Sequence, residues 1–308
     1  MQFDSVQLET FVAVLDEGSF DAAARRLSVT PSAVSQRIKA LESRLGQVVV
    51  MRGKPARATA AGEALLRLAR QVALLELEAI AAVRGTIDAQ RIPLAVNADS
   101  LNNWFLPAML DLSRTHDARF LVHQEDEEHS AEYLRNGTVL AAVTADPRPV
   151  QGCRVVPLGK MRYLPLATPE YAERWLTGKP LPEALAAAPM VVFNEKDVLQ
   201  HRLVRKVTRR KLDPPSHAIP ASAPFHEAVR IGLGWGMIED QVAGPELAAG
   251  RLVEVAPGKY IDVPLYWQHW KLESGVLDAL TAAVLRAAKA GLRTVTQRTP
   301  SARSRSRP

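Results

Sequence analysis

Apolar residues recur at three- and four-residue spacing at the start of the chain and predict three helices. The first covers residues 5–17, and Gly18 suits the left-handed position that closes a helix. Ser19 and Thr30 suit the N-caps of the second and third helices, and Pro31 suits the first position of the third. The pattern therefore predicts a core of three helices.

The second and third predicted helices are joined by a short turn, Ser28-Val29, as in a helix-turn-helix. In that motif the second helix enters the major groove of DNA with its N-terminal end first. Its exposed polar side chains are expected to face bases or phosphates, namely Ser32, Ser35, Gln36 and Lys39. Contacts with the DNA backbone are expected from Thr30 and Arg37. An ordinary αα-hairpin with a polar outer face is the alternative.

After Gly46, the run VVVMRGKPARAT combines a β-prone stretch, a turn and a basic return, which predicts a hairpin wing. Arg52, Lys54 and Arg57 could then reach the DNA backbone or minor groove. Arg52 is expected to position the protein on DNA and not to read its sequence. A surface hairpin with solvated cations is the other interpretation.

One long helical pattern extends from about Thr59 to Asp88. Its apolar positions form two adjacent stripes, which together are too wide for one packing partner. One stripe has the spacing of a coiled-coil seam and comprises Leu65, Leu68, Val72, Leu75, Ala79 and Ala82. We expect a dimerisation helix that also packs on the DNA-binding domain, so that two copies fit a two-fold-related site. A core helix within one domain is the alternative.

The remaining two-thirds of the chain alternates strand-like and helical patterns, which is typical of an α/β fold with parallel sheets. The predicted strands are 92–96, 120–124, 140–144, 155–158, 164–167, 190–193, 236–238, 252–255 and 263–267. The predicted helices are 102–114, 130–136, 170–176, 195–210, 224–233 and 276–292.

The net charge of +6 adds little to the nucleic-acid argument, because residues 289–308 alone hold six Lys and Arg and no acid. DNA binding is therefore predicted from the helix-turn-helix motif and not from the charge. Residues 296–308 are expected to form a disordered basic tail. The sequence has no secretory signal, no apolar run of about 20 residues and one cysteine, Cys153, which predicts a cytoplasmic protein that does not contact the membrane.

The N-terminal pattern LETFVAVLDEGSFDAAARRLSVTPSAVSQRIKALESRLG, followed by a wing and the helix start ATAAGE, resembles the LysR-type transcriptional regulators. Downstream, IPLAVNADSL, HQEDEE, LAAVTADPRPVQGCRVVPLGKMRYL, VVFNEKD and PLYWQHW resemble the ArgP/LysG branch, whose members respond to arginine and lysine. The resemblance covers the whole chain apart from the basic tail.

This resemblance implies a multi-domain fold. A winged helix-turn-helix (residues 1–58) and a long linker helix (59–90) would precede a two-lobed α/β effector domain like a periplasmic binding protein (91–295). Lobe I would comprise about 91–163 and 267–295, and lobe II about 164–266. Family members are commonly homotetramers built as dimers of dimers. They bind double-stranded promoter DNA and change its contacts or bend when an effector binds. Members of the ArgP/LysG branch activate export or metabolic genes for basic amino acids. RNA polymerase is a further expected partner, and a homodimer is the simpler assembly.

In open α/β sheets, ligands bind beyond the carboxyl ends of the strands. Ser100, Leu101 and Asn102 follow the first such strand at a helix start, which suits the carboxylate of an amino acid. After the next strand come four acids, of which Glu125 and Asp126 are candidate partners for a cationic side chain. Ser100 serving only as an N-cap and a solvated acidic loop are the alternatives.

Five further residues complete the expected effector site: Thr144, Asp197, Ser222, Trp267 and His269. Thr144 ends the third strand, and the others would come from lobe II and the returning crossover strand. For Trp267 a place in the hydrophobic core is an equally good interpretation.

An enzyme is the main competing interpretation. The seven histidines lack metal-ligand spacing, no GxSxG motif occurs, and the glycines at 232, 234 and 236 follow a helix where a dinucleotide fingerprint follows a strand. We therefore expect no catalytic site, metal or cofactor. A solute-binding protein fits the second part of the chain but leaves the first 90 residues unexplained. An effector other than lysine or arginine remains open.

Overall fold

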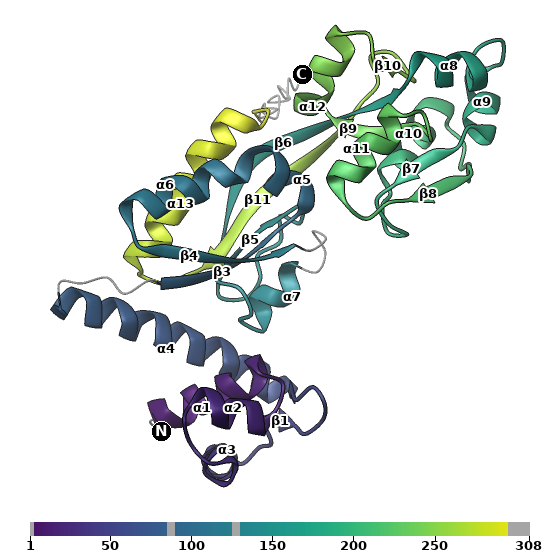
Figure 1. The fold of residues 1–308 in the computed structure, drawn as a ribbon. Coiled ribbons are helices and arrows are strands. Elements are labelled where there is room, and N and C mark those ends of the chain that lie inside the picture. The colour runs from purple at the N-terminus through teal and green to yellow at the C-terminus, as the bar shows by residue number, and fades with distance from the viewer. Residues whose placement is uncertain (1–2, 85–89, 125–129, 295–308) are drawn as a thin grey trace, which may run out of the picture. The chain divides into compact units, whose positions relative to one another are not determined.

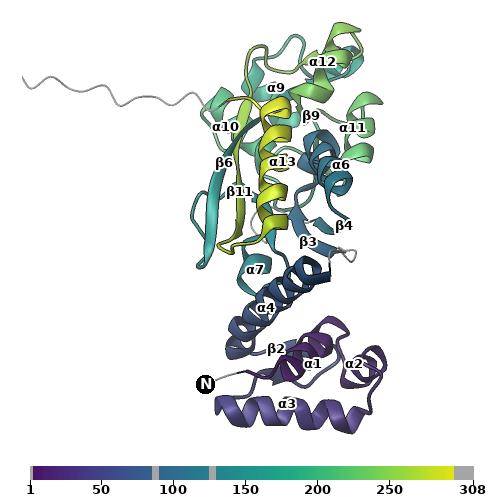
Figure 2. The same cartoon turned by 90° about the vertical axis from the view of Figure 1, so that its left-hand side faces the viewer.

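The computed structural model describes residues 3–84, 90–124 and 130–294 of the chain (Figures 1 and 2). The chain forms two compact units. Unit 1 comprises Met1–Leu101, Phe105–Val156 and Tyr266–Arg286, and unit 2 comprises Asn102–Trp104, Pro157–Leu265 and Ala287–Pro308. No described helix is long and apolar enough to cross a membrane.

Unit 1 begins with three helices, α1 (Ser5–Asp16), α2 (Phe20–Arg26) and α3 (Pro31–Leu45). The predicted N-caps of α2 and α3 are confirmed, because the Ala22 N–H donates to Ser19 Oγ and the Ala33 N–H donates to Thr30 Oγ1, each at 3.2 Å. Their shared core is fully buried and includes Phe11, Val14, Val34, Ile38 and Leu41. The predicted three-helix core is confirmed.

A two-stranded wing follows α3, with β1 (Val50–Met51) antiparallel to β2 (Arg57–Ala58). Glu42 on α3 positions the segment that leads into the wing, because its Oε1 accepts a hydrogen bond from the backbone N–H of Val49 at 3.0 Å. Thr59 Oγ1 accepts from the Gly62 N–H at 3.1 Å and donates to Val48 O at 2.8 Å. These bonds join α3, the wing and the next helix.

The long helix α4 spans Ala60–Arg84, and the end predicted near Asp88 lies outside the described residues. Leu65, Leu66 and Ala69 are buried in the N-terminal core. The large apolar side chains that remain exposed on α4 are Leu68, Leu75, Leu77, Ile80 and Val83. One side of α4 thus packs on its own chain, and the other shows apolar side chains to solvent.

The sheet of unit 1 has the order β11-β5-β3-β4. Its strands are β3 (Gln90–Val96), β4 (Ala118–Gln124), β5 (Ala141–Thr144) and β11 (Ile261–Trp270). β4 and β5 pair parallel with β3, whereas β11 is antiparallel to β5. The accompanying helices are α5 (Ala98–Ser100), the π-helical segment η1 (Leu101–Phe105), α6 (Leu106–Thr115), α7 (Ser130–Arg135) and α13 (Gly275–Gly291).

In unit 2, β9 (Gly236–Glu239) and β10 (Val253–Glu254) pair antiparallel with β6 (Cys153–Ala167). A separate parallel pair is formed by β7 (Met190–Val192) and β8 (Ser216–Ala218). The helices are α8 (Pro169–Trp175), α9 (Leu181–Ala187), α10 (Leu199–Thr208), α11 (Ser222–Arg230) and α12 (Asp240–Ala248).

Three sequence predictions were wrong in detail. The strands predicted at 155–158 and 164–167 are one strand, β6, which passes through Gly159 because Lys160 pairs with the backbone of Arg293. The helix predicted to start at residue 195 begins at Leu199, since a turn occupies the preceding residues. The helix predicted at 102–114 begins four residues earlier, with α5. The sequence patterns also gave no sign of α9, α12 and β8.

Candidate nucleic-acid interface and ligand site

The outer face of α3 is polar and open to solvent. Ser32, Gln36 and Lys39 are exposed and Ser35 is half-buried, whereas Val34, Ile38 and Leu41 on the opposite face are buried. The hydroxyls of Thr30 and Ser32 lie 3.0 Å apart at the helix start. Hydroxyl, amide and ammonium groups are thus presented together, as donors to base edges or phosphates require.

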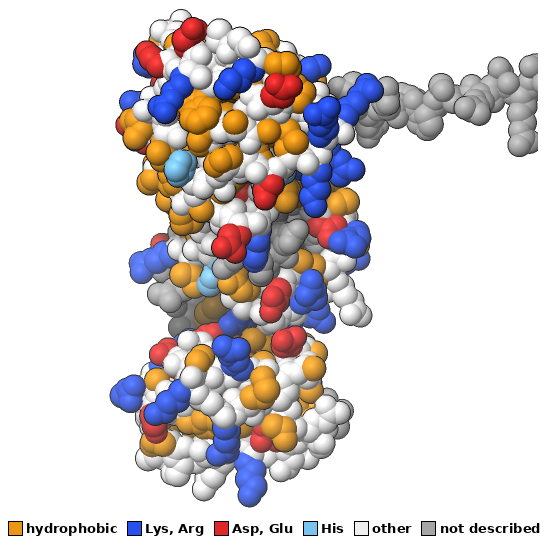
Figure 3. Space-filling view, turned by 90° about the vertical axis from the view of Figure 1, so that its right-hand side faces the viewer, with side chains coloured by type: hydrophobic (Ala, Val, Ile, Leu, Met, Phe, Trp, Pro, Cys, Tyr) orange, Lys and Arg blue, Asp and Glu red, His pale blue; other side chains and the backbone are white. Residues whose placement is uncertain are grey.

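Two arginines that were expected to contact the DNA backbone, Arg37 on α3 and Arg52 in the wing, have partners within the N-terminal domain. Arg37 is half-buried, and its Nη1 donates to Thr10 Oγ1 on α1 at 3.3 Å. Arg52 is exposed on the wing, with its Cζ 4.9 Å from the centroid of the Phe20 ring. Figure 3 shows Lys and Arg side chains around the N-terminal helices at the bottom of the view. Arg37 thus contacts α1, and Arg52 contacts Phe20 at the start of α2.

The carboxyl ends of β3, β4 and β5 lie at one edge of the sheet of unit 1, because the three strands are parallel. Ser100, on the helix that follows β3, is fully buried, and its Oγ has no hydrogen-bond partner within the described part of the chain. Buried hydroxyls are normally paired. The hydroxyl of Ser100 is therefore a candidate donor to a ligand at this edge of the sheet.

The other residues expected at this edge differ in their surroundings. Thr144 is buried, and its Oγ1 accepts from the Asp146 N–H at 3.1 Å. Leu101 is half-buried at the start of η1. Asn102 is exposed and belongs to unit 2. Glu125 and Asp126 lie outside the described residues.

Trp267 and His269 lie in the interior of unit 1. Trp267 is fully buried, and its Nε1 donates to Thr281 Oγ1 on α13 at 3.1 Å. His269 is 4% exposed, and its Nδ1 lies 2.9 Å from Trp270 O. Burial lowers the pKa of the His269 imidazole, which favours the neutral ring. The position of Trp267 agrees with the other interpretation given above, a place in the hydrophobic core.

Asp197 and Ser222 are both in unit 2. The carboxylate of Asp197 accepts from two backbone N–H groups, those of Phe193 at 2.9 Å and Leu199 at 3.0 Å. It therefore shapes the turn between β7 and α10. Ser222 is half-buried as the first residue of α11.

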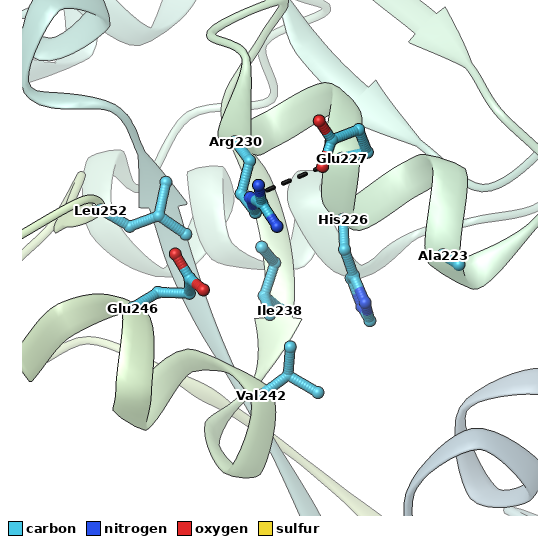
Figure 4. Close-up of a pocket in the computed structure, with 8 residues that line it drawn as sticks. All are labelled: Ala223, His226, Glu227, Arg230, Ile238, Val242, Glu246 and Leu252. Atoms are coloured by element: carbon cyan, nitrogen blue, oxygen red, sulfur yellow. Dashed lines mark ion pairs between the residues drawn. The ribbon is translucent and has the colours of Figure 1, made fainter. Parts of the chain in front are cut away.

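A polar cluster in unit 2 was missed from the sequence. Glu239 has a side chain only 2% exposed, with Oε2 2.9 Å from His226 Nε2. Asn103 Nδ2 donates to Glu239 Oε1 at 3.1 Å. Beside them a cavity of about 340 Å³ is lined by Ala223, His226, Glu227, Arg230, Ile238, Val242, Glu246 and Leu252 (Figure 4). The only signal in the sequence was an acid ending the apolar run WGMIE.

Comparison with known proteins covers both parts of the chain. Residues 6–63 match the bacterial regulatory helix-turn-helix proteins of the lysR family, and residues 88–289 match the LysR substrate-binding domain. The regulator LysG of Mycobacterium tuberculosis is 50% identical over 94% of this chain and 95% of its own. The crystal structure of ArgP from the same organism is 48% identical, has a TM-score of 0.88, and covers 96% of this chain and 100% of its own.

A third relative, the lysine export transcriptional regulatory protein LysG of Corynebacterium glutamicum, is 43% identical over 94% of this chain and 99% of its own. A full-length structure of that LysG with bound effector Arg is 41% identical, has a TM-score of 0.80, and covers 94% of this chain and 100% of its own. These relatives are described as transcriptional regulators and not as enzymes.

Proposed function

The chain belongs to the LysR family of bacterial transcriptional regulators, and we propose that it binds promoter DNA as an oligomer and responds to lysine or arginine. Control of genes for the export or metabolism of basic amino acids follows from the same proposal, with activation as the expected direction. Its relatives support this proposal through what their names state. A LysR-type regulator with a different small effector is the alternative.

The DNA contacts are assigned to α3 and the wing. Ser32, Ser35, Gln36 and Lys39 present donors to the major groove, and Thr30, Arg37 and Arg52 hold the protein on the backbone. Such a regulator acts in the cytoplasm, where the promoter DNA and RNA polymerase are. The domains are assigned as 1–58, 59–90 and 91–295, with 296–308 as a basic tail.

The main support for an effector site at this sheet edge is the buried, unpaired hydroxyl of Ser100. The α-carboxylate of an amino acid would accept a hydrogen bond from it and from N–H groups at the helix start. A guanidinium or ammonium group needs a carboxylate when it leaves water. Glu125 and Asp126 follow β4, whose end lies at the same sheet edge as Ser100.

Self-association is assigned to α4. Its exposed leucines, isoleucine and valine form a surface that a second copy would cover. Two copies would present two α3 helices to a two-fold-related DNA site. A tetramer would then arise from two such dimers.

Isothermal titration of the full chain with L-lysine, L-arginine and uncharged L-norleucine tests the effector assignment. We expect heat of binding from the basic amino acids and none from norleucine, because norleucine lacks the cationic group. Glu125→Gln with Asp126→Asn should weaken the basic ligands selectively. Absence of heat from all three ligands at a few millimolar would remove lysine and arginine as effectors and leave the DNA-binding assignment standing.

A further inference from the structure

Within residues 157–265, which make up most of unit 2, the Lys and Arg residues are concentrated in one segment. Residues 157–265 contain 14 Lys and Arg and 12 Asp and Glu. Six of those cations lie between 202 and 211, where no acid occurs, so the rest of 157–265 holds 8 cations against 12 acids. The segment is therefore a basic surface within residues 157–265, which are otherwise acidic.

This basic segment is formed by α10 and the residues that follow it. Leu203 and Val204 are buried beneath the helix, and the six cations are exposed: Arg202, Arg205, Lys206, Arg209, Arg210 and Lys211. In Figure 2, α10 lies at the left-hand edge of unit 2. Figure 3, seen from the opposite side, shows Lys and Arg side chains gathered at the corresponding right-hand edge.

The cations of this segment are not neutralised by neighbouring acids. Lys206 Nζ donates to Tyr260 O at 2.7 Å and lies 4.9 Å from the centroid of the Tyr260 ring. No ion pair joins any of the six cations to an acid within the described part of the chain. The dipole of α10 favours cations in its last turn. The dipole does not explain Arg202, which lies in the first turn of the helix. Its helical neighbours Arg205 and Lys206 repel the Arg202 guanidinium.

The backbone conformation of Arg209 is a second, independent observation that favours a role for positive charge at this surface. Arg209 caps α10 in the left-handed conformation, with φ +58° and ψ 16°, and its N–H donates to Arg205 O. Glycine normally occupies this position because a Cβ is strained there. This position is occupied by an arginine despite the strain, and its side chain is exposed.

We propose that this basic surface contacts the phosphate backbone of double-stranded DNA, in addition to the contacts of α3. A row of exposed cations without acids matches a polyanion better than a small ligand or an acidic protein with localised charges. A duplex long enough to reach both surfaces would be held at a high effective concentration, so contacts that are weak alone would add to binding. The inference rests on the DNA-binding function proposed above.

The test compares full-length protein with Arg202→Gln/Arg205→Gln/Arg209→Gln and a control, Arg174→Gln/Lys179→Gln/Lys259→Gln. Both variants lose three exposed cations of unit 2. Affinity for random-sequence duplexes of about 20 and about 60 base pairs is measured by fluorescence anisotropy over a series of salt concentrations.

On the longer duplex, the α10 variant should bind more weakly, and its salt slope should fall by about 0.9 for each phosphate that the protein no longer neutralises. The control variant should match the unaltered protein. Arg209→Gly should unfold at a higher temperature and still bind the longer duplex more weakly, because glycine relieves the strain but removes the charge.

Equal slopes in the α10 variant, the control and the unaltered protein would overturn the proposal. Unchanged DNA binding with loss of regulated transcription would also overturn it and would point to an acidic protein partner. If the unaltered protein bound neither duplex, the DNA-binding assignment itself would fail, an outcome distinct from failure of the α10 contact alone.

Discussion

Ser100 is buried without a hydrogen-bond partner among the described residues, and its hydroxyl is proposed to donate to the effector. Ser100→Ala should lower affinity for arginine about tenfold or more, because a hydrogen bond to a charged group contributes about 1.5–3 kcal/mol. Folding stability should stay unchanged or rise, since no intramolecular bond is removed. Titration calorimetry and thermal unfolding measure the two effects.

A matched control is Thr168→Ala in unit 2, where Thr168 Oγ1 accepts from the Tyr171 N–H at 3.1 Å and caps α8. That change should cost about 1 kcal/mol of stability without altering arginine binding. If Ser100→Ala instead lost stability and kept its affinity, Ser100 would be a structural residue.

Gln36 and Lys39 lie on the exposed face of α3, away from the core. Gln36→Ala with Lys39→Ala should weaken DNA binding at least tenfold, because one base contact alone is worth about 1–3 kcal/mol. The variant should remain folded, since neither side chain is buried. Anisotropy titration checks the affinity, with Ser43→Ala at the far end of α3 as control. Equal affinities for both variants would refute the assignment of the α3 face.

At the scale of single residues, the sequence allowed capping to be predicted better than the surroundings of polar groups. Ser19 and Thr30 were identified from local spacing, because a cap depends on residues three positions away. The role of Asp197 was missed, since it depends on how the loop after β7 folds. Trp267 was ambiguous because strand alternation does not say which face of the sheet a helix covers.

The start of α4 is set by how closely it approaches the wing. A Cβ on Gly62 would lie 2.1 Å from Val49 O, a backbone atom that cannot rotate away. Gly62→Ala should therefore destabilise the N-terminal domain by about 1–3 kcal/mol. Thermal or urea unfolding measures the change.

Gly275→Ala, at the first position of α13, provides the opposite expectation for the same substitution. A Cβ there meets nothing within 4 Å, so alanine should stabilise unit 1 by about 0.4–1 kcal/mol, because it lowers the conformational entropy of the unfolded chain. A stabilising effect at both positions would show that α4 does not approach the wing so closely.

Charged substitutions on α4 test whether its exposed apolar side chains mediate self-association. Leu68→Glu with Leu75→Glu should shift the protein from oligomer to monomer in sedimentation velocity, because each buried leucine contributes about 1.5–3 kcal/mol to an interface. Val48→Glu with Val198→Glu, which alters exposed apolar residues outside α4, should leave the oligomer unchanged. A monomeric unaltered protein would exclude the assembly proposed for α4.

At the scale of elements, long periodic segments were predicted better than breaks. The pattern of α4 was evident from its apolar spacing, whereas the single strand β6, which contains Gly159, was predicted as two strands. A glycine does not end a strand when the next residue pairs with another segment, as Lys160 does with Arg293. Helices α9 and α12 each contain a proline, which hides their periodicity.

For the whole molecule, the order of strands and helices was enough to predict the winged helix-turn-helix, the long helix and the α/β part that follows. The family assignment agrees with this order. The cavity beside His226 and the buried Glu239 were not predictable, because they bring together residues far apart in the sequence. The net charge also did not indicate the basic surface of α10, because acids elsewhere in residues 157–265 offset its cations.

The most direct test of the account is whether a basic amino acid changes how this protein holds its own operator. The operator is first selected from a random duplex pool, and affinity and nuclease footprint are then measured with L-arginine, L-lysine or L-norleucine. We expect arginine or lysine, but not norleucine, to change the affinity about tenfold or to shift the footprint, and Ser100→Ala to abolish the response. An affinity and footprint that are the same with all three ligands would contradict the account of a regulator controlled by basic amino acids.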